Sequence, residues 1–350
     1  IDLLRTKPAR FICLLGLACL GGRAFRAAAA EGHWELVDAQ LTHYRMEHAA
    51  TLLRDGTVLV TGGLYHDQGW QSIAECEQFD PATRQWSPAP SMLQDRRHHG
   101  AVLLDNGNVL VVGGSGDDSV PLSSCEIYDP VARRWGATAP LPSPVARVSS
   151  IFRLDDGRIF VSGLAGVYVF EPKSESWSAV EIPALWRGWL LNNGKVLFPG
   201  TAGSVLYDPG TGHTEPTGAS RFPVGTPAQA VTFSNGKLLK VGGATDVQPY
   251  EIYDPVSGSW SSTGPTDPYG DVTHYDQHTV SLLPNGKAFL VGGWDPWPSM
   301  GIPINDVELF DPVSETWARG PDMNRRRAEH TATLLNTGQL LVVGGNGDYG

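Results

Sequence analysis

Residues 77–114, EQFDPATRQWSPAPSMLQDRRHHGAVLLDNGNVLVVGG, contain most of the pattern that decides the fold. The stretch begins with an acidic residue, an aromatic-Asp-Pro turn and a Trp, and it ends with Asn-Gly between two apolar runs and a Gly-Gly pair. Asn-Gly or Asp-Gly in this setting is the strongest local signal for a β-hairpin, because a type I′ turn needs positive φ at both central residues. Apolar runs without polar alternation indicate strands covered on both faces.

The same features recur along the whole chain. Seven tight-turn dipeptides are Asp55-Gly56, Asn106-Gly107, Asp156-Gly157, Asn193-Gly194, Asn235-Gly236, Asn285-Gly286 and Thr337-Gly338. Six aromatic-acidic-Pro triplets are Phe79-Asp80-Pro81, Tyr128-Asp129-Pro130, Phe170-Glu171-Pro172, Tyr207-Asp208-Pro209, Tyr253-Asp254-Pro255 and Phe310-Asp311-Pro312. Five of these triplets precede a Trp that opens the next strand, and Thr214 takes its place in the fourth unit. Each unit is therefore predicted to contain two hairpins, and so four antiparallel strands.

Units of this size, with a double glycine and a late Trp, resemble kelch repeats in the form of the bacterial kelch consensus. The resemblance implies an all-β fold, a seven-bladed kelch-type β-propeller of four-stranded antiparallel blades around a central channel. Units three and four depart most, because Ser162-Gly163 and Pro199-Gly200 replace the glycine pair.

The two ends of the chain determine how the ring closes. Trp34 stands before Arg45 much as the other Trp residues stand before the next unit, so it is predicted to lie on the outer strand of the last blade. The last unit ends at Gly350 without an aromatic-Asp-Pro strand. We therefore predict a last blade that is incomplete at the C-terminus and closed by an N-terminal strand. Either the natural protein continues beyond Gly350 or this blade is one strand short and exposes an edge.

Residues 1–30 have the order of a secretory signal, with basic residues, the apolar run 11–20 and the small-residue stretch 27–30. We expect a signal peptide over 1–30, a propeller over 31–350, and a protein that is secreted, periplasmic or attached to the cell surface. Cys13 and Cys19 belong to the signal, and Cys76 and Cys125 occupy equivalent places in successive units, which predicts buried free thiols.

Composition excludes several classes of protein. The 41 Gly and 26 Pro residues are incompatible with a helical bundle, and the apolar run 11–20 is too short for a membrane span. A net charge of −11 leaves no basic footprint for nucleic acid. We expect a monomer.

Candidate binding residues recur before the innermost strand of several units. One position holds Arg45, Arg96 and Arg327, and a second, three residues later, holds His48, His99, His278 and His330. Further arginines, including Arg97, Arg147 and Arg187, lie nearby. Because arginine binds carboxylate, sulfate and phosphate through a planar fork, these seven side chains are predicted to form an anion-recognising channel mouth. The alternative is structural, in which each Arg pairs with a Glu of the repeat and each His bonds from blade to blade.

The sequence favours a recognition module over an enzyme. The predicted ligand is an acidic glycan or an acidic protein segment, with no cofactor and no metal, and motifs such as HExxH, CxxC and GxSxG are absent. One alternative is an enzyme acting on anionic sugars, as in kelch sialic-acid mutarotases. Another is a copper radical oxidase similar to galactose oxidase, but Gln277 stands where that family's adjoining Tyr is needed.

Long loops at 64–70 and 294–298 form a third candidate surface. Their aromatic and acidic groups suit stacking on sugar rings, or equally the capping of a blade.

Overall fold

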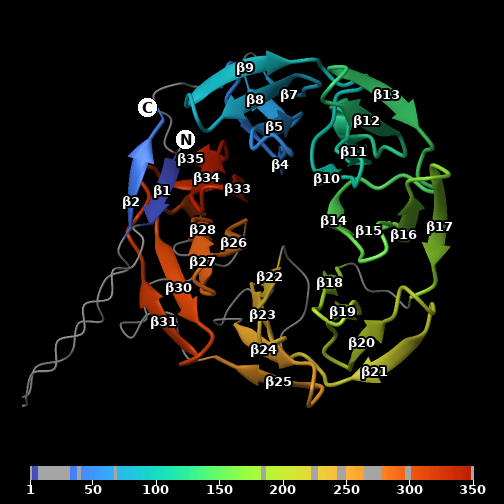
Figure 1. Cartoon of the computed structure of the whole chain (residues 1–350), viewed down its shortest axis with the longest axis vertical. Coiled ribbons are helices and arrows are strands. Elements are labelled where there is room, and N and C mark those ends of the chain that lie inside the picture. Colours follow the sequence, from blue (N-terminus) through green and yellow to red (C-terminus); the bar gives the residue numbers. More distant parts are fainter. Residues whose placement is uncertain are drawn as a thin grey trace, which may run out of the picture.

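The computed structural model describes residues 2–6, 32–37, 41–66, 69–182, 187–221, 228–242, 250–263, 277–295 and 301–347. Over these ranges seven four-stranded antiparallel sheets stand around a central axis as blades of a propeller (Figure 1). The predicted fold class is therefore confirmed. We number the blades 1 to 7 along the chain. No helix in these ranges has the length and hydropathy that crossing a bilayer requires.

Blades 1 to 4 are each built from consecutive parts of the chain, and their strands are given from the axis outward. Blade 1 contains β4 (Ala49–Leu52), β5 (Val58–Thr61), β8 (Cys76–Asp80) and β9 (Gln85–Ala89). Blade 2 contains β10 (Gly100–Leu103), β11 (Val109–Val112), β12 (Cys125–Asp129) and β13 (Arg134–Thr138). Blade 3 contains β14 (Val148–Arg153), β15 (Ile159–Gly163), β16 (Gly166–Glu171) and β17 (Ser176–Val180). Blade 4 contains β18 (Trp189–Leu190), β19 (Val196–Phe198), β20 (Ser204–Tyr207) and β21 (Thr214–Thr217).

Blades 5 and 6 follow the same order, whereas blade 7 combines the two ends of the chain. Blade 5 contains β22 (Gln229–Thr232), β23 (Leu238–Val241), β24 (Glu251–Asp254) and β25 (Ser259–Ser262). Blade 6 contains β26 (Thr279–Leu282), β27 (Ala288–Val291), β30 (Val307–Asp311) and β31 (Thr316–Arg319). Blade 7 contains β33 (Thr331–Leu334), β34 (Leu340–Val343), β1 (Asp2–Thr6) and β2 (Gly32–Leu36).

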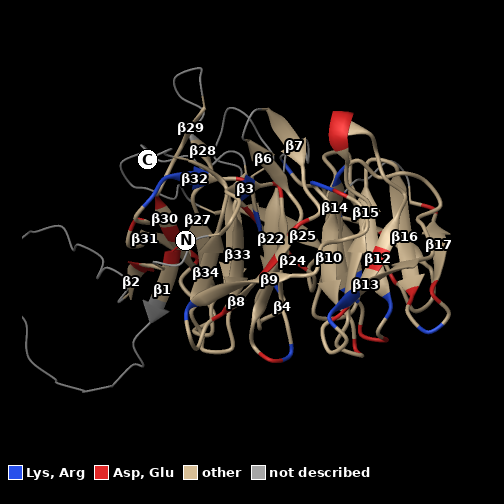
Figure 2. Ribbon diagram, turned by 90° about the horizontal axis from the view of Figure 1, so that it is seen from above, with Lys and Arg blue, Asp and Glu red and all other residues tan. Residues whose placement is uncertain are grey.

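Short extra elements lie at one edge of the ring, above the start of the innermost strands. They are β3 (Arg45–Met46), β6 (Leu64–His66), β7 (Trp70–Ser72), β28 (Trp294–Asp295), β29 (Ile302–Pro303), β32 (Arg327–Ala328), β35 (Asn346–Gly347) and the 3₁₀ turn η1 (Asp117–Ser119). Figure 2 shows β6, β7, β28 and β29 together at this edge.

The strand that was predicted to be missing from blade 7 is present, because β1 pairs with β34 on one side and β2 on the other (Figure 1). Leu3 packs into the core between blades 7 and 1, and Leu4 packs into the core between blades 7 and 6. Burying these two side chains contributes about 1.5 to 3 kcal/mol each. The expected exposed edge was therefore wrong, and two N-terminal strands, not one, close the ring.

This strand falls within the predicted signal peptide. The rest of that peptide, residues 7–30, lies outside the described residues. Cleavage after Ala30 would remove β1, so the seven complete blades are those of the uncleaved chain. The signal peptide itself stays a prediction.

The seven turn dipeptides do join the inner strands, but the predicted type I′ geometry is wrong. Positive φ occurs at the glycine of each turn, for example Gly56 at 86°, and not at the preceding residue. That residue instead stabilises the turn through its side chain, as when Asp55 Oδ1 accepts a hydrogen bond from the Thr57 amide at 3.0 Å.

Apolar cores lie between neighbouring blades. The second strand of each blade is buried on both faces, as β5 and β11 show. The outer Trp residues reach across to the preceding blade, and Trp135 Nε1 donates to the Pro90 carbonyl at 2.8 Å. Cys76 and Cys125 are buried free thiols, as predicted.

Candidate functional site

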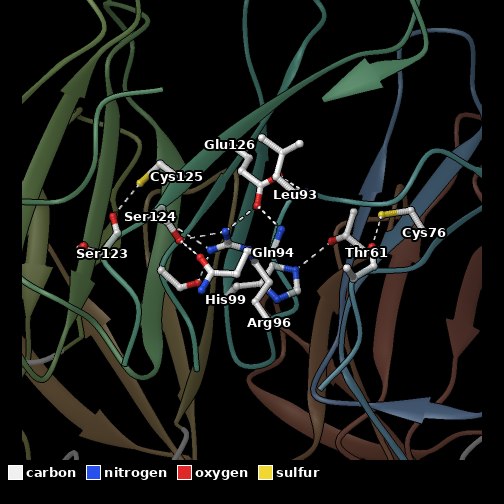
Figure 3. Close-up of polar contacts among 12 residues, drawn as sticks. Thr61, Cys76, Leu93, Gln94, Arg96, His99, Ser123, Ser124, Cys125 and Glu126 are labelled. Carbon is white, nitrogen blue, oxygen red and sulfur yellow. Dashed lines mark hydrogen bonds and ion pairs between the residues drawn. The ribbon is translucent and has the colours of Figure 1, made fainter. Parts of the chain in front are cut away.

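The three predicted arginines lie inside the blades. Arg45 and Arg96 are fully buried, and Arg327 is 4% exposed. Each binds an acidic residue on the third strand of its own blade, and the pairs are Arg45–Glu77 at 2.6 Å, Arg96–Glu126 at 2.7 Å and Arg327–Asp2 at 2.9 Å. Figure 3 shows Arg96 beside Glu126. The prediction that these arginines bind a ligand at the mouth is therefore corrected to the structural alternative.

Backbone contacts explain why arginine is needed at this position. In all three blades Nη1 donates to the carbonyl of the first residue of the Gly-Gly pair, which is Gly62, Gly113 or Gly344. One planar fork thus ties the third strand to the loop that follows the second strand, a geometry that lysine cannot reproduce. Burial lowers the pKa of Arg45, and the carboxylate of Glu77 opposes that effect.

Blade 5 obtains the same buried charge pair from a different strand. Lys240 on β23 is fully buried, and its Nζ lies 2.9 Å from Glu251 Oε2 and 2.9 Å from Ser220 Oγ. A buried carboxylate thus recurs in blades 1, 2, 5 and 7, and the cation that neutralises it comes from a different strand in blade 5.

The four predicted histidines do meet around one cavity. His48, His99, His278 and His330 all line a space of about 190 Å³ at the start of the innermost strands, which we call the mouth cavity. The four side chains are only 2% to 7% exposed. Three of them are hydrogen-bonded through Nε2 to a threonine of the preceding blade, and these pairs are His48–Thr331, His99–Thr61 and His330–Thr279.

These contacts make the histidines part of the wall. Burial and the nearby Arg45 lower the pKa of His48 to about 3, and burial with Arg96 holds the pKa of His99 well below its ordinary value. Neutral, hydrogen-bonded imidazoles of this kind join neighbouring blades. The four histidines lie around one cavity, as predicted. Three of them bond from blade to blade, which is the structural alternative given in the sequence analysis.

Residues one step before the histidines also line the mouth cavity. Glu47, His98, Gln277 and Glu329 occupy this position in blades 1, 2, 6 and 7, and all four have φ between 52° and 59°. Non-glycine residues in this conformation are strained and collect at functional sites. The sequence analysis missed Glu47, His98 and Glu329 and considered Gln277 only as the replacement for an oxidase Tyr, although their place directly before the histidines could have identified all four.

The Glu47 carboxylate is the centre of a charged network. His98 Nε2 lies 3.0 Å from Oε1, and Arg97 Nη1 donates to Oε2 at 3.3 Å. Burial raises the pKa of Glu47, but the hydrogen bond from His98 and the charges of His98, Arg97 and Arg147 outweigh it and leave the pKa lowered. Glu47 is therefore ionised at neutral pH and already has two partners.

Arg147 also lines the mouth cavity, and its hydrogen-bond partner is a neutral amide. It precedes the inner strand of blade 3 and donates from Nη2 to Gln277 Oε1 of blade 6 at 3.2 Å, across the channel. Within the described ranges no carboxylate lies within 4 Å of its guanidinium group. Arg187 also lines the cavity and donates to the Ala228 carbonyl. The mouth therefore presents two guanidinium groups beside the carboxyl groups of Glu47 and Glu329.

The predicted loop surface is present in part. Trp70 is 53% exposed, and its ring meets His66 edge to face at 4.8 Å. His43 and Tyr65 form a similar contact beside it, also at 4.8 Å. Residues 67–68 and 296–298 of the two loops lie outside the described residues.

Among the described residues, the lining of the mouth cavity contains imidazoles but no Tyr and no Cys, and Cys76 and Cys125 lie on the third strands of their blades. These residues by themselves do not supply the Tyr and Cys of copper radical chemistry, and Tyr275 lies outside the described residues. Within the described part of the chain, no three His, Cys, Asp or Glu side chains are grouped to hold a metal ion.

Comparison with known proteins agrees with the fold. The Kelch motif matches residues 48–93, 96–142 and 279–324. Galactose oxidase of Gibberella zeae is 22% identical over 312 residues, which cover 84% of this chain and 41% of that protein. Kelch-like protein 25 of Xenopus tropicalis is 27% identical over 238 residues, which cover 59% of this chain and 38% of that protein. The chain thus spans less than half the length of these relatives.

A solved structure described as a fungal alcohol oxidase of the AA5 family, in complex with copper, superposes with a TM-score of 0.69. It is 19% identical, and the match covers 88% of this chain and 71% of that one. The repeats and the ring define a β-propeller of the kelch type. The Kelch matches and the relatives support a propeller of the kelch-repeat superfamily.

Proposed function

We propose that this propeller is an interaction module whose mouth cavity binds an anionic group carried by an acidic protein segment or an acidic glycan. The Kelch motifs support an interaction role for the propeller. Arg45, Arg96 and Arg327 have no part in this proposal, because their charges are used inside the blades. The cations assigned to the ligand are instead Arg147 and Arg187, which line the mouth cavity.

The observation that carries the proposal is the half-buried guanidinium group of Arg147 with a neutral amide as its hydrogen-bond partner. A carboxylate that replaces the Gln277 amide would exchange a neutral hydrogen bond for a charge-assisted one, which is about twice as strong. Arg147 of blade 3 and Gln277 of blade 6 are in hydrogen-bond contact across the channel, so one anion could contact side chains from both blades.

The test compares Arg147→Ala with Arg325→Ala. Arg325 is exposed and does not line the mouth cavity, so it is a matched control for loss of one positive charge. Binding to arrays of acidic peptides and acidic glycans is measured, together with the melting temperature. We expect about a tenfold loss of affinity for Arg147→Ala only. Equal affinity of both variants, or no binding of any anionic probe by the unaltered chain, would contradict the proposal.

A second candidate is an enzyme acting on anionic sugars at the same mouth. It is favoured by the contact between the Glu47 carboxylate and the His98 imidazole, a pair of the type used for general acid–base catalysis. The test follows the interconversion of glucuronic acid anomers by NMR, with and without the protein. Acceleration that Glu47→Gln abolishes would support the enzyme, and an unchanged rate would exclude it for this sugar.

Export also belongs to the proposed function and rests on the N-terminal sequence. Export is tested by measuring the mass of the protein recovered from a secreting host. Cleavage after Ala30 would lower the mass by that of residues 1–30, and the mass of the full chain would contradict cleavage at this site.

A further inference from the structure

A long connection joins the third strand of blade 7 to the fourth. In blades 1 and 2 these two strands are joined by residues 81–84 and 130–133, whereas residues 7–31 join β1 to β2. A longer connection lowers the effective concentration of a segment at its binding position. Strand β1 is therefore held chiefly by its contacts in the sheet. We call the position that it occupies between β34 and β2 the blade-7 groove (Figure 1).

The groove pairs with the main chain of its occupant on both sides. Strand β1 pairs with β34 from Asp2 to Leu4 and with β2 from Asp2 to Thr6, antiparallel in both cases. Main-chain pairing of this kind gives affinity to any extended segment, and the pockets for alternate side chains give specificity. The side chains of β1 therefore show what the groove selects.

Three consecutive side chains of β1 are buried in the groove. The Asp2 carboxylate lies 2.9 Å from Arg327 Nη2 and accepts a hydrogen bond from Asn324 Nδ2 at 3.0 Å. Leu3 packs between blades 7 and 1, and Leu4 packs between blades 7 and 6. The groove thus accepts an acidic residue followed by two apolar residues.

The other blades show that the third of these positions suits an aromatic ring. Leu4 corresponds to Phe79 of blade 1, because each lies two residues after the acid that binds the buried arginine. Five blades place such a ring on their outer Trp, with centroid distances of 5.1 Å for Phe79–Trp86, 5.0 Å for Tyr128–Trp135, 4.8 Å for Phe170–Trp177, 5.1 Å for Tyr253–Trp260 and 5.0 Å for Phe310–Trp317.

The outer Trp of blade 7 has a different environment. Trp34 is paired in register with Leu4, and its ring contact is Phe289 of blade 6 at 6.0 Å. Aromatic pairs add stabilisation beyond that of buried area, so an occupant with an aromatic residue in place of Leu4 would gain a contact that β1 does not make.

We propose that the blade-7 groove is a second binding site, which takes an extended segment of a partner protein with the pattern acidic–apolar–aromatic in place of β1. Charge complementarity fixes the first position, because the buried guanidinium group of Arg327 requires a carboxylate. The blades of the chain itself fix the third position. The site is separate from the mouth cavity, whose lining does not include Arg327, Asn324 or Trp34.

Three blocked, labelled peptides test the pattern. The first is Gly-Glu-Ile-Tyr-Asp-Pro-Gly, which carries the third-strand sequence 251–255 of blade 5. The second has Gln in place of Glu, and the third has Leu in place of Tyr. Binding to the full chain is followed by fluorescence anisotropy. We expect the first peptide to bind about tenfold more tightly than either of the others.

A substitution that weakens β1 should strengthen peptide binding. Asp2→Asn removes the carboxylate of β1 and leaves the groove intact, so we expect about tenfold tighter binding of the first peptide and a higher melting temperature in its presence. The control Glu215→Gln removes a surface carboxylate of blade 4 and should bind like the unaltered chain. Leu4→Ala provides a second weakened strand in case Asp2→Asn does not fold, which circular dichroism verifies.

Hydrogen exchange locates the bound peptide. The amides of residues 2–6 should exchange faster in the presence of the first peptide, whereas those of β34 should stay protected because a new strand replaces the old one. Unchanged exchange of β1, or a loss of affinity in Arg147→Ala, would assign the peptide to the mouth cavity and overturn the proposal.

The remaining outcomes are equally decisive. Equal affinity of the Glu and Gln peptides would overturn the role of Arg327, and equal affinity of the Tyr and Leu peptides would overturn the aromatic preference. A chain that elutes as a dimer in size-exclusion chromatography and becomes a monomer with the peptide would make a second copy the occupant, not a partner protein. Failure of the unaltered chain and both β1 variants to bind the first peptide would overturn the site.

Discussion

The guanidinium group of Arg327 binds the carboxylate of Asp2 at 2.9 Å, across 325 positions of the chain. Asp2 also accepts a hydrogen bond from Asn324 Nδ2 at 3.0 Å. In blades 1 and 2 the same place belongs to Glu77 and Glu126, which come from the same repeat as their arginines. Blade 7 thus reproduces the internal ion pair of the repeat with partners from opposite ends.

Substitution Asp2→Ala should destabilise the propeller strongly. It leaves the buried charge of Arg327 unpaired, which costs about 3 to 5 kcal/mol in free energy of unfolding. Urea unfolding followed by tryptophan fluorescence measures the change. The control is Glu215→Ala, which removes the exposed pair with Lys195 and should cost less than about 1 kcal/mol. Equal effects of the two substitutions would show that β1 does not close the ring in solution.

A chain that begins at Glu31 should lose stability for the same reason. It lacks β1, so Leu341 and Val343 of the second strand lose the packing of Leu3, and Arg327 loses its partner. We expect a lower melting temperature and faster limited proteolysis in blade 7 than in the full chain. A processed chain with an unchanged melting temperature would mean that another strand takes the place of β1.

A buried arginine and an arginine of the mouth cavity should affect stability differently when replaced. Arg96→Ala leaves Glu126 buried without a cation and should cost about 3 to 5 kcal/mol. Arg134→Ala, at an exposed position, is the control, and Arg147→Ala should leave stability close to that of the control. Thermal melts measure all three. A stable Arg96→Ala variant would show that the buried pair is dispensable.

Acid should destabilise the fold through its buried histidines. The folded-state pKa of His48 is about 3 because burial and Arg45 disfavour the charged ring, and the pKa in the unfolded chain is near the ordinary value of 6.5. The unfolded chain therefore binds the proton first, and stability falls as pH decreases from 6.5 toward 3. Substitution His48→Gln should flatten the pH dependence of the melting temperature, whereas His213→Gln at an exposed position should not. If the melting temperature depends on pH in the same way in both variants, His48 is not a source of the acid sensitivity.

The thiols of Cys76 and Cys125 should resist alkylation in the native protein. Burial raises their pKa values to about 12 and 11, so the thiolate is scarce at pH 8. Iodoacetamide treatment followed by peptide mapping should modify neither residue in buffer and both in urea. Modification of Cys76 in buffer would show that the space between blades 1 and 2 opens in the native state.

The repeat made the fold and the ring of histidines predictable, because equivalent positions in a propeller meet around one axis. It could not predict which way a side chain points. Arg96 and Arg97 are neighbours, yet the first lies inside the blade and the second reaches Glu47 at the mouth, because adjacent residues of an extended segment point to opposite sides. Positions counted from the turn glycine therefore selected the buried arginines over Arg147.

Strand β1 escaped prediction because it lacks the aromatic-Asp-Pro ending of its counterparts. Its remaining signal, one acidic residue before two leucines, is common in any sequence. Register with β34, which pairs Leu3 with Leu341, exists only once the ring is assembled.

Closure by β1 has a consequence for biosynthesis. Strand β1 belongs beside β34, and it must wait until the ribosome has translated the chain as far as β34. Blades 1 to 6 can assemble in order on the nascent chain, since each consists of neighbouring segments. Until synthesis has passed Val343, the ring of blades is open, and the apolar face at each of its two ends is exposed. These faces must be covered by a chaperone or by packing against each other.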